Sequence, residues 1–175
     1  MSQRLRNKAR RILDRMFTDE PLECLETLMT NWIEQSQTAS GPAAYSATSL
    51  LQVLESARPK RIIPALFNSI YSRTSPAAID ANRMSSLTTD IADSDLGQFL
   101  VEYSQSVDAD AMDEIWADCM AFIRDVLTNP LPHHNILPSL LIFLVILGEK
   151  IESTNFGEQR KMRKDLAVST ACDRG

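Results

Sequence analysis

The sequence predicts an all-α protein. Apolar residues recur at spacings of three and four through most of the 175-residue chain, which is typical of helices with one buried face. Proline and cap-type polar residues stand at the breaks between these segments. The chain contains only 5 glycines, fewer than the turns of a β-protein would need, and its 44% hydrophobic content is enough for an ordinary core.

The first two predicted helices are separated by only a few residues of sequence. Residues 2–16 carry one apolar stripe, and Thr18-Asp19-Glu20-Pro21 is typical of a helix start, because a polar cap precedes a proline in the first turn. A second helix is therefore expected from this point to about Gln35. The stripe of the first helix consists of Leu5, Ala9, Ile12, Leu13 and Met16.

The next pair follows a loop. Residues 36–46 are small and polar, which predicts a connection. A third helix is expected over 47–57 and is ended by Pro59. A fourth is expected over 61–72, with Pro64 in its first turn, where the missing N–H costs little.

The third pair begins after the most loop-like stretch, residues 73–94, in which a helical turn near 85–91 is possible. A fifth helix is expected over 95–105. The sixth, over 108–128, has the clearest apolar face, and acidic residues in its first turns complement the helix dipole.

The seventh predicted helix follows a break at Asn129-Pro130-Leu131-Pro132 and covers 134–151. Its middle is apolar nearly all round, so we expect either an exposed apolar strip or burial of that strip by self-association. A short basic helix is expected over 157–167. The residues expected to form this partner or self-association surface are Leu140, Phe143, Leu144 and Leu147.

The predicted helices group into four pairs with a step typical of HEAT- or armadillo-like two-helix repeats, which predicts an α-solenoid segment. No repeated motif links the pairs, so an irregular helical bundle is the alternative. The pairs cover residues 2–35, 47–72, 95–128 and 134–167. The resulting organisation is a basic amphipathic N-terminal helix (1–16), a helical-repeat segment (17–167) and a disordered tail (168–175).

Charge is concentrated at the amino terminus. The chain carries a net charge of −5, yet residues 1–15 hold six basic side chains and one acid, Asp14. A basic amphipathic helix can bind an anionic membrane or partner, can serve as a mitochondrial import signal, or can be the first helix of a stack. The acidic remainder argues against nucleic-acid binding. The basic residues are Arg4, Arg6, Lys8, Arg10, Arg11 and Arg15.

No residue pattern points to catalysis. His133 and His134 stand beside a helix start with no Cys or His at metal-ligand spacing, and the glycines are isolated. Three distant cysteines indicate reduced thiols, and the longest apolar run is too short to span a bilayer. We therefore expect no catalytic, cofactor or metal site and no small-molecule substrate.

Several long strings in the chain resemble the fungal Dopey proteins, over about residues 15–166. The clearest is Met112-Asp-Glu-Ile-Trp-Ala-Asp-Cys-Met-Ala-Phe-Ile-Arg-Asp-Val-Leu127 with Asn129-Pro-Leu-Pro-His133 after it. The other matching strings are Glu20-Pro-Leu-Glu23, Phe67-Asn-Ser-Ile-Tyr-Ser-Arg-Thr74 and Thr154-Asn-Phe-Gly-Glu-Gln-Arg-Lys-Met-Arg-Lys164.

The resemblance implies a segment of a very large, peripheral, helical-repeat scaffold that acts in traffic between endosomes and the late Golgi. It also implies two partners, a large scaffold related to Arf exchange factors and a phospholipid flippase, and a location on the cytoplasmic face of Golgi and endosomal membranes. After Lys164 the family continues into another apolar helix, so this chain is expected to be a fragment. The alternative is a small soluble or mitochondrial protein whose basic N-terminus directs import.

Overall fold

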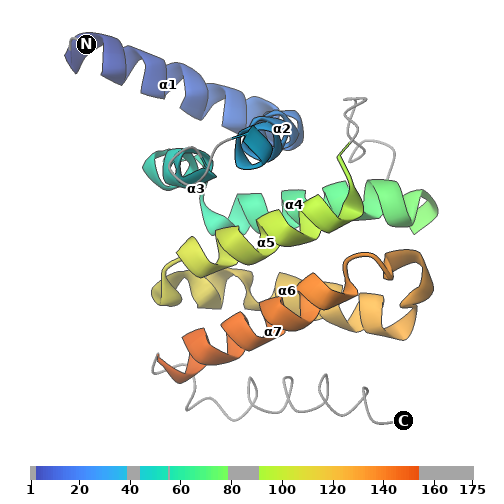
Figure 1. Ribbon diagram of the computed structural model, residues 1–175. Coiled ribbons are helices and arrows are strands. Elements are labelled where there is room, and N and C mark those ends of the chain that lie inside the picture. The colour runs from blue at the N-terminus through green and yellow to red at the C-terminus, as the bar shows by residue number, and fades with distance from the viewer. Residues whose placement is uncertain (1–2, 39–43, 55, 79–90, 154–175) are drawn as a thin grey trace. The chain divides into compact units, whose positions relative to one another are not determined.

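In the computed structural model, the described residues form α-helices and short 3-10 turns, and none of them forms a strand (Figure 1). The all-α prediction is therefore confirmed. The chain divides into two compact units, Met1–Leu96 and Gly97–Gly175. The residues that the structure describes are 3–38, 44–54, 56–78 and 91–153.

The first unit is organised around α2. This helix packs against α4, α3 and α1, and the single residue Glu20 separates it from α1. Figure 1 shows α1 extending away from the other helices of the unit toward its amino terminus. The elements are α1 (Gln3–Asp19), α2 (Pro21–Thr38), α3 (Ala44–Val53), α4 (Pro59–Thr74) and the 3-10 turn η1 (Pro76–Ala78).

Large aliphatic side chains from α2, α3 and α4 form the core of the first unit. Their spacing of three and four along each helix places them on one face, so burial of this face stabilises all three helices at once. The most deeply buried of them are Leu25, Met29, Leu51, Ile62, Ile63, Leu66 and Ile70.

A charged residue also lies inside this core. Glu26 on α2 is fully buried and accepts a hydrogen bond from Ser69 on α4, with 2.6 Å between Oγ and Oε1. The Arg73 guanidinium lies 3.7 Å from the same carboxylate oxygen. Glu26 falls in register with Leu22 and Met29. Its place in the apolar stripe of α2 is a sequence signal for burial, although the sequence-based prediction did not include it.

The second unit is held together by the facing sides of α5, α6 and α7. Lys150 on α7 donates hydrogen bonds to the carbonyls of Gln105 and Val107, at the carboxyl end of α5, where a cation complements the helix dipole. The elements are α5 (Asp93–Ser106), η3 (Ala109–Ala111), α6 (Met112–Thr128), η4 (Leu131–His133) and α7 (Leu137–Glu152). The core includes Phe99, Leu100, Ile115, Cys119, Ile123, Phe143 and Leu147.

Close approach of α5 and α7 depends on a glycine. A Cβ atom at Gly97 would lie 2.8 Å from the Cβ and Oγ of Ser139, which is closer than real Cβ contacts come. A Cβ atom at Gly148, farther along α7, would meet open space. Gly97 is therefore required by packing in the second unit, whereas Gly148 is not.

The helix boundaries differ from the predictions at two prolines and at the starts of the sixth and seventh helices. Pro59 begins α4 instead of ending the preceding helix, so Pro64 lies inside α4 and not in its first turn. The sixth helix begins at Met112, after η3, and the seventh at Leu137, after η4. The predicted helix at 157–167 and the tail at 168–175 lie outside the described residues, as does most of the possible turn at 85–91. The order of helices is consistent with a solenoid-like fold.

Candidate interaction surface

Helix α1 is attached to its unit by its carboxyl-terminal half. Phe17 is its buried residue, while Leu13 and Asp14 are half-buried. The Asp14 carboxylate accepts hydrogen bonds from the backbone N–H (3.3 Å) and hydroxyl (3.0 Å) of Ser56, in the connection between α3 and α4. Arg10 lies 3.8 Å from the same carboxylate. These contacts hold the end of α1 and leave its first ten residues uncovered.

The uncovered part of α1 carries an apolar stripe. Leu5, Ile12 and Met16 are 56%, 54% and 50% exposed, and residues 3–12 are all exposed. Spacings of seven and four residues place the three side chains above one another on one face. At about 100° per residue, Phe17 points about 120° away from Leu5 around the helix. The stripe is therefore distinct from the face that packs against the protein.

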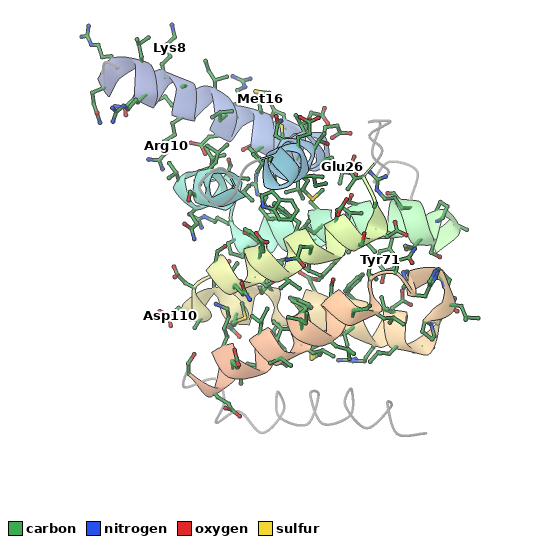
Figure 2. All side chains as sticks on the ribbon, viewed as in Figure 1. Lys8, Arg10, Met16, Glu26, Tyr71 and Asp110 are labelled. Carbon is green, nitrogen blue, oxygen red and sulfur yellow. The ribbon has the colours of Figure 1, made fainter. Side chains whose placement is uncertain are left out.

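The six predicted basic residues all lie on α1, and they differ in their pairing. Arg10 and Arg15 lie 3.8 Å and 3.6 Å from Asp14 and Asp19, one helical turn away. No ion pair within the described ranges involves the other four, namely Arg4, Arg6, Lys8 and Arg11. Figure 2 shows Lys8 projecting from α1 on the side away from α2 and α3, and Arg10 on the side of α3.

The apolar stripe continues into an open groove beside the start of α2. The groove has a volume of about 480 Å³ and is lined by Ile12, Arg15, Met16, Asp19, Glu20 and Cys24. A second open cleft, of about 560 Å³, separates the α1–α2 connection from α4. Acidic Asp19, Glu20 and Glu23 line it together with Lys60 and Arg61, so its lining is of mixed charge.

The prediction of an apolar strip on α7 is wrong about which face of the helix is exposed. Leu140, Phe143 and Leu147 are buried within the chain, and Leu144 is half-buried. The spacing of three and four residues keeps these side chains on one face, and that face is buried because it is the one that meets α5 and α6. The apolar residues that α7 exposes are instead Leu141 (51%), Ile142 (49%) and Val145 (59%).

The two described thiols lie in surroundings that favour their protonated form. Burial raises the pKa of the Cys24 thiol, with the nearby Glu23 and Glu20 adding to the effect, and burial likewise raises the pKa of Cys119. Both thiols therefore hold their protons, and the protonated thiol is a weak nucleophile. His133 is buried, whereas the exposed His134 has its Nδ1 3.0 Å from the Leu131 carbonyl.

Two other classes of site are not found in the described part of the chain. No group of three or more His, Cys, Asp or Glu side chains there could hold a metal ion. No helix there is long and apolar enough to cross a bilayer. The surface of α1 is thus the candidate site that the described residues present most clearly.

Comparison with known proteins agrees with the resemblance seen in the sequence. A family described as DOP1 C-terminal matches residues 99–170. Protein dop1 of Emericella nidulans is 53% identical over 165 residues, which are 94% of this chain and 9% of that protein. Protein DOP1 of Saccharomyces cerevisiae is 27% identical over 181 residues, covering 95% of this chain and 10% of the yeast protein.

No solved structure matches the chain. The two curated relatives are both far longer than the chain, but the matched stretches cover nearly all of its length, including both units. The identity to the Emericella protein is too high and too extended to arise from helical composition alone. The chain therefore belongs to the Dopey family, and it corresponds to a small part of the family's much longer members.

Proposed function

We propose that the chain is a non-enzymatic scaffold segment of a Dopey-like protein that acts in vesicle-mediated traffic between endosomes and the late Golgi. The observation that supports this proposal most directly is the 53% identity to the Emericella protein along 94% of the chain. Stacked helices present long surfaces to partners, and this suits a scaffold better than a small-molecule enzyme.

The proposed location is the cytoplasmic face of Golgi and endosomal membranes, with attachment to the surface and not across the bilayer. The proposed partners are proteins, namely a large scaffold related to Arf exchange factors and a phospholipid flippase. The exposed apolar residues of α1 and α7 are surfaces on which such partners could bind.

The experiment that tests this function removes the segment from the full-length protein that contains it. Residues 21–153 are deleted from a fluorescently tagged copy, and the tag is imaged together with late Golgi and endosome markers. We expect the tag to lose its overlap with the late Golgi and endosome markers. We also expect cargo that normally recycles from endosomes to the Golgi to remain in endosomes. A matched control carries Val53→Ser, which changes an exposed residue and leaves the core intact.

The rival function predicts a different outcome. If the tagged native chain enters mitochondria and residues 1–15 are removed, the basic helix is an import signal and the trafficking function is wrong. Import requires the helix to be cleaved, whereas a scaffold segment keeps it. The mass of the mature amino terminus therefore separates the two functions.

A further inference from the structure

We propose that α1 binds the surface of an anionic lipid bilayer, with Leu5, Ile12 and Met16 in the acyl boundary and the surrounding basic side chains on the lipid phosphates. The proposal rests on the peripheral membrane association proposed above and names the surface responsible. Two faces of α1 differ in their burial. The face that contains Phe17 packs against the protein, whereas the stripe formed by Leu5, Ile12 and Met16 is half exposed or more.

The position of the basic residues favours a bilayer over a protein groove. At about 100° per residue, Lys8, Arg15 and Arg4 flank one side of the stripe, and Arg6 lies on its other side. Long basic side chains at these angles can lay their methylenes along the acyl boundary and reach up to the phosphates. A protein groove would have to place acidic residues on both sides of the stripe to match them.

The acidic residues of α1 lie in its carboxyl-terminal half, and each contacts another side chain. The Asp14 carboxylate is turned toward Ser56, 3.0 Å from its hydroxyl, and Asp19 is paired with Arg15 at 3.6 Å. The first eleven described residues of α1, 3–13, contain no acid at all. Arg4, Arg6, Lys8 and Arg11 therefore present positive charge that forms no ion pair with an acidic residue in the described ranges, and an anionic surface attracts it.

The anchoring of α1 gives the stripe a fixed orientation. Contacts of Phe17, and of Asp14 with Ser56, fix the carboxyl-terminal half of α1 on its unit. Leu5 and Met16 are eleven residues apart, so the stripe is about 16 Å long at 1.5 Å per residue. A rigid helix of this length can lie flat in the interface without refolding, in contrast to a peptide that becomes helical only on binding.

The test uses the full 175-residue chain and two vesicle types, phosphatidylcholine alone and phosphatidylcholine with phosphatidylserine. The expected result is co-flotation with the anionic vesicles only. Ile12→Trp supplies a fluorescent reporter whose emission shifts to the blue on insertion; the native Trp32 and Trp116 are buried and give a constant background. Replacing one flanking cation, as in Arg4→Gln or Lys8→Gln, is expected to weaken binding roughly fivefold at low salt.

Matched control variants distinguish binding through the α1 stripe from nonspecific hydrophobic or electrostatic binding elsewhere on the chain. Leu5→Ser is expected to weaken binding at every salt concentration, whereas Val53→Ser, at a residue of α3 with the same 56% exposure, leaves binding unchanged. Lys60→Gln, at an exposed cation on α4, likewise leaves it unchanged. Because all these positions are exposed, circular dichroism of each variant should match that of the wild type.

Three outcomes overturn the proposal. Either the wild-type chain ignores anionic vesicles, or Leu5→Ser binds as well as the wild type, or the Ile12→Trp reporter keeps its emission wavelength on binding. If the chain instead binds poly-glutamate with the same dependence on Leu5 and does not bind vesicles, the surface belongs to an acidic protein partner. Failure here leaves the trafficking function standing, because that function is judged by the deletion of residues 21–153, which spares α1 up to Asp19.

Discussion

The Ser69 hydroxyl on α4 donates a hydrogen bond to the fully buried Glu26 carboxylate on α2, with 2.6 Å between Oγ and Oε1. A buried carboxylate is costly unless polar groups compensate for the water that it loses. Ser69 and, at 3.7 Å, Arg73 provide this compensation, and both are on the same helix, one turn apart. The contact therefore fixes the register between α2 and α4 in the first unit.

Ser69→Ala is expected to lower the free energy of unfolding by roughly 1–3 kcal/mol, because the buried Glu26 carboxylate loses a hydrogen-bond donor. Urea unfolding followed by circular dichroism measures the change. The control is Ser72→Ala on the same helix, where the hydroxyl only donates to the Asn68 carbonyl of its own turn. Equal effects of the two substitutions would show that Glu26 does not depend on Ser69.

Two glycine substitutions in the second unit are expected to act in opposite directions. Gly97→Ala places a Cβ 2.8 Å from Ser139, which forces α5 and α7 apart at a cost of about 1–3 kcal/mol. Gly148→Ala meets open space in the middle of a helix, and alanine there stabilises by about 0.5–1 kcal/mol. Thermal unfolding of both variants measures whether each substitution raises or lowers the stability. A Gly97→Ala protein as stable as the wild type would contradict the close approach of α5 and α7.

The two faces of α7 are expected to respond differently to truncation. Phe143→Ala removes a fully buried ring and should cost about 3–5 kcal/mol, as large-to-small core substitutions do. Leu141→Ala, two residues away on the exposed face, should change stability by no more than about 0.5 kcal/mol. If Leu141→Ala proves as costly as Phe143→Ala in urea unfolding, the outer face of α7 is covered in solution.

Thiol reactivity is expected to report on folding of the second unit. Cys119 is fully buried and its pKa is raised, so at a given pH less of it is thiolate than of an ordinary cysteine. In a Cys172→Ser background, a chromogenic disulfide reagent should react slowly with Cys24 and reach Cys119 only on unfolding. The raised pKa values mean that reaction with Cys24 accelerates as the pH rises. Fast labelling of Cys119 in the native protein would contradict its burial.

Within the described residues, the structure confirms the seven longer helices that the sequence predicted, and the reason is local. Residues that face one side of a helix must recur every three or four positions, so the stripe of α6 from Ile115 to Val126 is visible in the sequence before any partner is known. Prolines likewise mark the helix breaks, although Pro59 and Pro64 show that the same residue type can begin a helix or lie within one. Boundaries depend on packing as well as on local propensity.

The apolar content of α7 was visible in the sequence, but the choice of its inward face was not. Leu140, Phe143 and Leu147 compete with Leu141, Ile142 and Val145 for burial, and on a helix that is apolar nearly all round periodicity cannot decide between them. Only the positions of α5 and α6 do so, because the face that meets them is the one removed from water.

Polar contacts between distant segments likewise could be identified only from the tertiary structure. Asp14 and Ser56 are 42 residues apart, and Glu26 and Ser69 are 43 apart, so no local pattern joins them. The basic residues and apolar stripe of α1 followed from the sequence alone, since they lie within one helix. That this stripe is left exposed followed only from the structure, in which α1 packs through Phe17 on a different face. Local spacing defines which side chains share a face, and tertiary packing decides which face is buried.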